Sequence, residues 1–398
     1  MTHLIPPPPG RGLGGGIAAL ALALCGSFAQ AAPFTPKSDS EVVEKLPGNS
    51  DPAVRGVESL RRQLAARPDD NTLRLDIAER YFGLAMAQGD PRYVGYAFAA
   101  LAPLDAKPPS DARYWLVRGQ LQQYSHDFDG ALKSLDKSSE LDPKNPAPPA
   151  WRAAIRMVQA RYGDALRECE KLATIGDKLY AQGCEAYVQA SSGQLQQAYD
   201  GLRAAFASTA HVDPGIALWL HTRLAEMAIR LQHWDEAEDH FKAGLQQGLT
   251  DQFLLGAYAD FLIERQRPKE ALKLVAGWER SDVLLLRLAL AGKAAGDPRA
   301  ADWARQLRER FEAAAQRGDR LHEQEAARFA LDIEGKPAEA LALAKRNYEV
   351  QKEPRDAEIL LRAAAAARQP DVAKPALEWL RESHYQDPHL AQLAGALK

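Results

Sequence analysis

The chain has 398 residues, of which 46% are hydrophobic and 26% are charged, and its formal net charge is -3. This apolar fraction is typical of a folded protein and excludes a chain that is disordered throughout. The charge balance lacks the basic excess that drives binding to phosphate backbones, so we expect no nucleic-acid partner.

The N-terminal segment, residues 1–31, has the layout of an export signal. Arg11 supplies a positive charge, residues 16–26 form an apolar core too short to span a bilayer, and an A-x-A cleavage motif ends at Ala31. We therefore predict a signal peptide cleaved after Ala31 and a periplasmic or secreted mature chain, with an uncleaved anchor as the alternative. A lipid anchor on Cys25 is disfavoured, because a leucine precedes it where bacterial lipoprotein signals place a small residue.

The next segment, residues 32–50, is rich in proline, serine and charge, and we interpret it as a flexible linker. Asp51 and Pro52 then form an N-cap and first-turn pair, which predicts a helix that ends near Ala66. No later apolar run reaches the roughly 18 residues that a membrane helix needs, so the mature chain should contain no transmembrane helix.

One stretch, from residue 115 to residue 143, combines bulky, small and helix-ending residues in a fixed order. In "ALKSLDKSSEL" the apolar residues recur at helical spacing on one side and the charged residues lie on the other. Proline ends the helix, because it lacks an amide donor. The residues that define the stretch are Trp115, Gly119, Phe128, Ala131, Leu135, Leu141 and Pro143.

The small residue of this stretch recurs along the chain about every 34 residues. Its positions are Ala97, Ala131, Ala165, Ala198, Ala237, Ala271, Ala301, Ala340 and Ala376. The pattern resembles the tetratricopeptide repeat, a 34-residue helix-turn-helix unit. The resemblance implies an all-α fold, a right-handed superhelical solenoid of antiparallel helix pairs with about nine repeats in residues 51–390. Residues 387–398 are predicted to form a C-terminal capping helix.

Two cysteines, Cys169 and Cys184, remain after signal cleavage, and the repeat places them on neighbouring helices. An exported pair can oxidise to a disulfide. The alternative is that both are small buried hydrophobic residues, since helix axes 8 to 10 Å apart often keep sulfurs from meeting.

The resemblance also implies a binding surface, the concave groove lined by the first helices of successive repeats. Aromatic and amide groups followed by an acidic stretch suit an extended peptide with a basic end. The alternative is that these side chains are ordinary solvated residues. The groove candidates are Gln120, Gln123, Tyr124, Tyr187, Glu226, Arg230, Asp260 and Glu264.

Signals for catalysis are weak in this chain. We find no nucleophile elbow, phosphate-binding glycine loop or H-E-x-x-H motif. His233, Glu236 and His240 share one side of a helix and could form a metal site, but Trp234 and Phe241 already define that helix's core stripe, so a solvated face is the preferred interpretation. We therefore expect no enzyme activity, no metal and no cofactor.

The sequence thus favours a non-enzymatic scaffold or adaptor of the bacterial cell envelope that binds a protein segment in its groove. One alternative is an accessory protein of polysaccharide export or outer-membrane assembly. Another is a glycan-acting enzyme with a helical-repeat cleft, although no separate catalytic module is visible. The identity of the partner is not encoded in the pattern.

Overall fold

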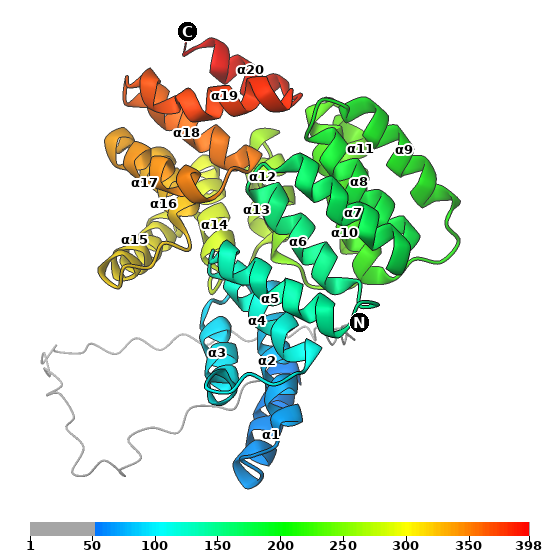
Figure 1. The fold of residues 1–398 in the computed structure, drawn as a ribbon. Coiled ribbons are helices and arrows are strands. Elements are labelled where there is room, and N and C mark those ends of the chain that lie inside the picture. The colour runs from blue at the N-terminus through cyan, green and yellow to red at the C-terminus, as the bar shows by residue number, and fades with distance from the viewer. Residues whose placement is uncertain (1–51, 398) are drawn as a thin grey trace, which may run out of the picture.

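The computed structural model describes residues 52–397, so the predicted export signal, linker and Cys25 lie outside the described residues. The described chain is all-α, with twenty α-helices, one short 3-10 helix and no strand. Helices α1 (Pro52–Ala66) and α20 (Pro388–Gly395) lie at its two ends (Figure 1). None of the helices described is both long and apolar enough to cross a membrane.

Nine helical hairpins lie between these end helices, which confirms the predicted all-α architecture of paired helices. They are α2 (Asn71–Gln88) with α3 (Arg92–Asp105), α4 (Ala112–Tyr124) with α5 (Phe128–Leu141), α6 (Ala147–Val158) with α7 (Tyr162–Ile175), α8 (Lys178–Ala190) with α9 (Leu195–Ser208), α10 (Pro214–Arg230) with α11 (Trp234–Leu245), α12 (Gln252–Glu264) with α13 (Pro268–Leu274), α14 (Asp282–Ala295) with α15 (Ala300–Gln316), α16 (Glu323–Asp332) with α17 (Pro337–Val350), and α18 (Pro354–Ala366) with α19 (Lys374–Ser383), the last pair joined by η1 (Pro370–Ala373).

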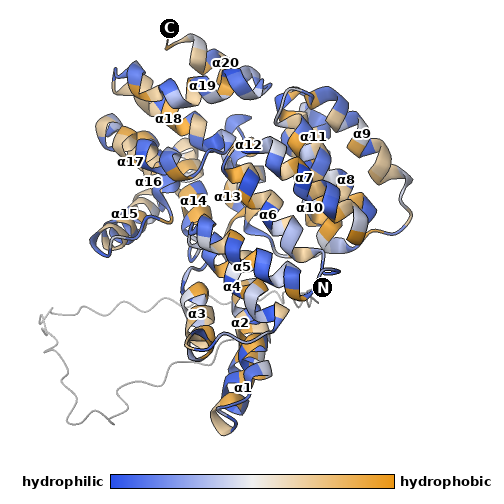
Figure 2. Ribbon diagram, in the orientation of Figure 1, coloured by the Kyte–Doolittle hydropathy of each residue, from blue (hydrophilic) through white to orange (hydrophobic). Residues whose placement is uncertain are grey.

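Helix α5 shows how the local sequence specifies these elements. Asp127 caps its N-terminus by accepting a hydrogen bond from the amide of Gly130 at 3.0 Å. Ala131 and Leu135 are fully buried on the side that faces α4, while charged residues lie on the other side. Figure 2 shows the same mixture of hydrophobic and hydrophilic residues along most helices. Each helix therefore depends on its neighbours to cover its apolar side.

The repeated small residue lies at the helix crossings. The alanines at positions 97, 131, 165, 198, 237, 271, 340 and 376 are all at most 2% exposed. The prediction for Ala301 was wrong, because this residue is exposed and Trp303 is buried in its place. The amide of Ala300 donates to the carbonyl of Asp297 at 3.0 Å, so Pro298 lies in the turn and α15 begins at Ala300, two residues after Pro298.

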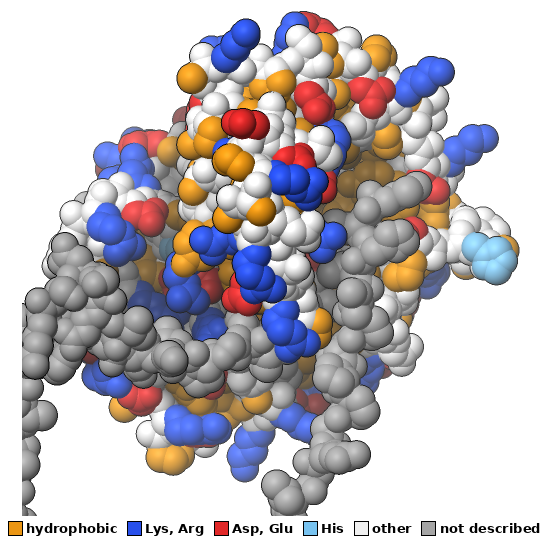
Figure 3. Space-filling model, turned by 90° about the horizontal axis from the view of Figure 1, so that it is seen from below, with side chains coloured by type: hydrophobic (Ala, Val, Ile, Leu, Met, Phe, Trp, Pro, Cys, Tyr) orange, Lys and Arg blue, Asp and Glu red, His pale blue; other side chains and the backbone are white. Residues whose placement is uncertain are grey.

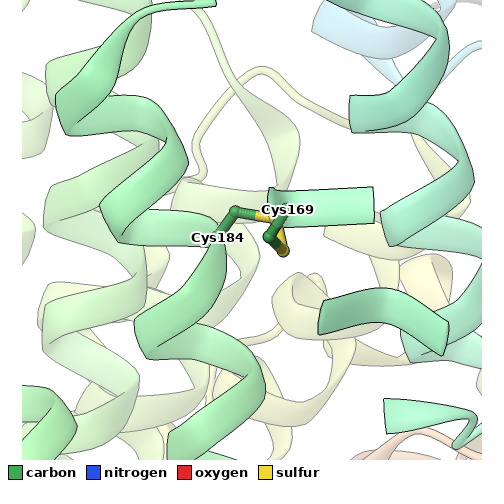
Figure 4. The surroundings of a disulfide bond; sticks show 2 residues. All are labelled: Cys169 and Cys184. Atoms are coloured by element: carbon green, nitrogen blue, oxygen red, sulfur yellow. A yellow bond between two sulfur atoms is a disulfide. The ribbon is translucent and has the colours of Figure 1, made fainter. Parts of the chain in front are cut away.

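Cys169 on α7 and Cys184 on α8 form a disulfide in the structure, with their Cα atoms 5.6 Å apart (Figure 4). Cys169 is fully buried, and its neighbours in the local core include Ala165 and Val188. The bond ties the second helix of one hairpin to the first helix of the next.

The array of hairpins curves until its C-terminal part meets its middle. The amide of Lys352 donates to the carbonyl of Val158 at 2.8 Å, and Trp379 Nε1 donates to the hydroxyl of Tyr162 at 2.9 Å. Helices α2 and α12, which are far apart in the sequence, also pack on each other. The concave side is therefore enclosed by the protein's own repeats.

Candidate functional site

The groove candidates lie on the first helices α4, α8, α10 and α12, and these helices face the C-terminal hairpins. Tyr124 is close to the charges of Asp319 and Glu325, which belong to the α15–α16 turn and to α16. Tyr187 is likewise close to Glu353 and Arg355 at the start of α18. Gln120 and Gln123 are half-buried on α4. The candidates thus surround the enclosed interior and do not line an open groove.

A cavity of about 580 Å³ lies where α3 and α4 meet the segment from α15 to α17. Its volume is in the range of pockets that bind small ligands or a few side chains of a peptide. Tyr124 is the groove candidate that lines it. The other lining residues are Pro91, Val94, Gly95, Phe98, Ser125, His126, Gly318, Asp319, Arg320, Leu321, Glu323, Asn347 and Val350.

The polar side of this cavity carries the tyrosine Tyr124, the histidine His126, two carboxylates and the guanidinium of Arg320. Burial, followed by the nearby charges of Asp90 and Asp282, raises the pKa of Tyr124 above its usual range, so its hydroxyl stays protonated and can donate. Burial lowers the pKa of His126, whose Nε2 accepts from the amide nitrogen of Gln351 at 2.9 Å. Glu323 is balanced by Arg320 and Arg346, whose nitrogens lie 3.1 and 2.8 Å from its oxygens. Asp319 makes no ion pair within the described residues, and its carboxylate accepts from the amide of Leu321 at 2.9 Å.

His322 and Glu325 form an ion pair next to the cavity, with Nδ1 and Oε2 3.8 Å apart. Burial opposes ionisation of Glu325, but the hydrogen bond and charge of His322 outweigh it and hold the pKa of Glu325 at about 2. The same pairing raises the pKa of His322, although burial acts in the opposite direction. Both groups therefore carry charge at neutral pH.

Tyr187 and Glu226 have partners from the chain itself. Arg223 lies over the ring of Tyr187 at 4.8 Å, and its Nη1 is 3.0 Å from Glu226 Oε2. Burial raises the pKa of Glu226, while Arg223 and Arg355 lower it. These side chains form a compact charged layer between α8, α10 and α18.

Asp260 is the most strongly engaged candidate. It accepts from Arg287 Nη2 at 2.6 Å and from Arg328 Nη1 at 2.8 Å, and these two guanidinium groups keep its pKa low although burial would raise it. Glu264 lies one helical turn further on, where burial and the charges of Asp260 and Glu358 raise its pKa to about 7. Asp260 thus joins α12 to α14 and α16, which is a structural role.

The residues His233, Glu236 and His240, weighed above as a metal site, have other partners. Glu236 accepts from the hydroxyl of Tyr199 at 2.7 Å, and His240 Nδ1 lies 3.2 Å from His221 Nδ1. In residues 52–397, no group of three or more histidine, cysteine, aspartate or glutamate side chains is arranged to hold a metal ion.

Comparison with known proteins gave likeness only among solved structures: no family model matches the sequence, and no curated protein matches it. Yeast Tom70 has 12% identity and a TM-score of 0.41, over 87% of this chain and 85% of that chain. The APC/C hetero-tetramer Cut9-Hcn1 has 12% identity and a TM-score of 0.39; this chain is covered over 87% but spans only 53% of the chain it matches. Pseudomonas aeruginosa PilF has 16% identity and a TM-score of 0.32, over 52% of this chain and 92% of that chain.

These scores carry no argument about function, and the helix pairs with their buried alanines decide the fold. It is a tetratricopeptide-like repeat fold. The repeat pattern predicted that Tyr124 lies on the first helix of its repeat, and in the structure it lies on α4, the first helix of the α4–α5 hairpin.

Sequence reasoning missed the other wall of the cavity. Asp319, Arg320 and Leu321 come from the turn before α16, and Asn347 and Val350 come from the end of α17. The 34-residue period describes contacts between neighbouring repeats, so it carries no signal for a wall supplied by repeats much further along the chain.

Proposed function

We propose that this chain is a non-enzymatic protein-interaction scaffold of the bacterial cell envelope, and that it binds a segment of a partner protein in the cavity at Tyr124. The observation that carries the proposal is the 580 Å³ cavity itself, which has an apolar side and the carboxylate of Asp319. The envelope location rests on the export-signal pattern of residues 1–31.

The lining of the cavity suggests the chemistry of the partner segment. Val94, Phe98 and Leu321 offer an apolar surface that fits one aliphatic or aromatic side chain. Asp319 lies in the same lining, and its carboxylate attracts a basic residue next to that apolar anchor, whereas Glu323 is already paired with Arg320 and Arg346. An extended peptide with an apolar residue beside a lysine or arginine matches both features.

Site-specific photo-crosslinking tests this function. A benzoylphenylalanine at Leu321, in the cavity, is compared with one at Ala301, which is exposed on α15 outside the cavity. In envelope extract, we expect the probe at Leu321 to crosslink one protein through a segment with apolar and basic residues, and the probe at Ala301 not to crosslink it. Asp319→Lys in the Leu321 probe protein should reduce this crosslink about ten-fold, which corresponds to about 1.4 kcal/mol. Identical crosslinks from both probes would contradict the proposal.

A further inference from the structure

A second site, separate from the Tyr124 cavity, lies where the connection between α19 and α20 crosses the ends of α8, α9 and α10. Arg230, at the end of α10, is only 7% exposed. Its Nε donates to the carbonyl of Gln386 at 2.9 Å, and its guanidinium lies 3.8 Å from the centre of the Tyr385 ring. Its Nη2 donates to the carbonyl of Ala190 at 2.5 Å, which holds the guanidinium in place.

Both the backbone and the side chain of Gln386 form hydrogen bonds with this part of the protein. Helix α9 begins at Leu195, and its N-cap residue Gln194 makes no side-chain capping bond. The amide of Leu195 donates instead to Gln386 Oε1 at 2.9 Å, so the C-terminal connection caps this helix from 191 residues away.

The backbone around this contact is shaped for close approach. Gly193, in the turn before α9, has a φ of +92°, and a Cβ added to it would lie 3.0 Å from His384 Cβ. Any other residue at this position would push the connection away while also straining the turn.

The contact surface is open at its edge. A cleft of about 480 Å³ lies between the α6–α7 turn, Ser192 and residues 382–384. Tyr162 lines this cleft and also accepts the hydrogen bond from Trp379. Tyr385 itself packs against the C-terminal hydrophobic core, with its ring centre 5.0 Å from that of Trp379, while residues 382–384 beside it border the open cleft.

A carbonyl, a side-chain amide and an aromatic ring held together are the contacts by which a protein binds an extended peptide. We propose that the surface formed by Arg230, Gly193 and the Leu195 amide is a peptide-binding site that the chain's own Tyr385 and Gln386 occupy. Its external ligand is a partner segment with an aromatic residue followed by glutamine, and this segment binds when the C-terminal connection leaves the site.

The attached segment has an advantage over any external one. A tethered ligand acts at an effective concentration on the order of millimolar, so an external peptide competes poorly with it in the unaltered chain. Removing the two side chains that fill the site, while leaving Arg230 and Leu195 in place, should therefore reveal binding from solution.

The test uses the full mature chain and a fluorescein-labelled peptide with the sequence of residues 380–390, followed by fluorescence anisotropy. The variant Tyr385→Ala, Gln386→Ala should bind the peptide at least about ten-fold more tightly than the unaltered chain does. Adding Arg230→Ala to this variant should abolish binding, and a control peptide with both residues replaced by alanine should not bind. The absence of binding to the double variant, or binding that survives Arg230→Ala, overturns the proposal.

Hydrogen exchange in the unaltered chain gives an independent measurement if the double variant does not fold. Unlabelled peptide at a concentration above the effective concentration of the attached segment, which is on the order of millimolar, should speed amide exchange in α20 and leave exchange in α5 unchanged. Unchanged exchange in α20 argues against displacement. Dimerisation of the double variant without peptide binding, seen by sedimentation, also overturns the proposal, because the site would then serve a second copy of the chain.

Discussion

In both the α4–α5 and the α14–α15 hairpin a glycine of the first helix lies close to the second helix, but the two hairpins distribute their small and large residues differently. In the first, Gly119 on α4 faces Ala131 and Leu135, and a Cβ on Gly119 would lie 2.8 Å from Leu135 Cγ. In the second, Gly292 on α14 faces Trp303, and a Cβ there would lie 2.9 Å from the indole ring.

This comparison shows that the close approach of two helices depends on the residues of both helices together and not on the residue at a single position. Where the second helix carries an alanine, a leucine one turn later fills the space over the glycine. Where it carries a tryptophan, the glycine on the first helix alone makes room for the ring. A search for the alanine alone therefore misplaces α15.

The largest expected loss of stability distinguishes Ala131, which lies at a buried helix crossing, from Ala301, which was wrongly predicted to lie at one. Ala131→Arg puts a charge and a long side chain into a fully buried crossing, and it should lower the free energy of unfolding by more than about 4 kcal/mol. The matched change Ala301→Arg, on an exposed position of α15, should change it by less than about 0.5 kcal/mol. Urea unfolding followed by circular dichroism measures both, and equal losses would contradict the proposed register.

A smaller loss of stability is expected when the large side chain at the α14–α15 crossing is removed. Trp303→Ala removes a side chain that is 4% exposed and should cost about 3 kcal/mol. Gly292→Ala should be more destabilising in the unaltered chain than in the Trp303→Ala variant, where the ring is gone and only the Ala300 Cβ, 3.1 Å from the added carbon, remains. A double-mutant cycle measured by urea unfolding gives the coupling, and strict additivity would show that the two residues do not share one crossing.

The smallest changes in stability are expected when single glycines are replaced by alanine. Gly119→Ala should destabilise the protein by about 1 to 2 kcal/mol, because Leu135 and the Ala131 carbonyl leave no space for the added carbon. Gly83→Ala, in the middle of α2 with no atom within 4 Å of the added carbon, should stabilise it by about 0.5 to 1 kcal/mol through helix propensity. Thermal melts of the two variants should shift in opposite directions, and shifts of the same sign would refute this explanation.

The sequence predicts the structural features that recur within each repeat. The start of α5 at Phe128 and the buried alanines follow from turn residues and helical spacing within one repeat. Ala301 was misplaced because Pro298 lies in the turn and α15 begins two residues later, whereas α13 and α17 begin at their prolines. The Gln386 partner of Arg230 could not be predicted, because it comes from a segment brought close only by the curvature of the whole array.

On one face of the molecule, basic and acidic side chains are interspersed in the described part of the chain, and no region of a single charge dominates the view (Figure 3). In the two proposals above, specificity for a partner comes from local contacts at Tyr124 and at Arg230.

Enclosure of the concave side also has a consequence for folding. Open helical arrays contact only their neighbours, so they nucleate locally and fray from either end. Here His126 meets Gln351 across 225 residues, and Tyr162 meets Trp379 across 217. Such distant contacts raise the contact order, which slows folding, and they link the unfolding of the C-terminal hairpins to that of the middle of the chain. Loss of the last hairpin should therefore lower the melting temperature of repeats that it follows by more than 150 residues in sequence.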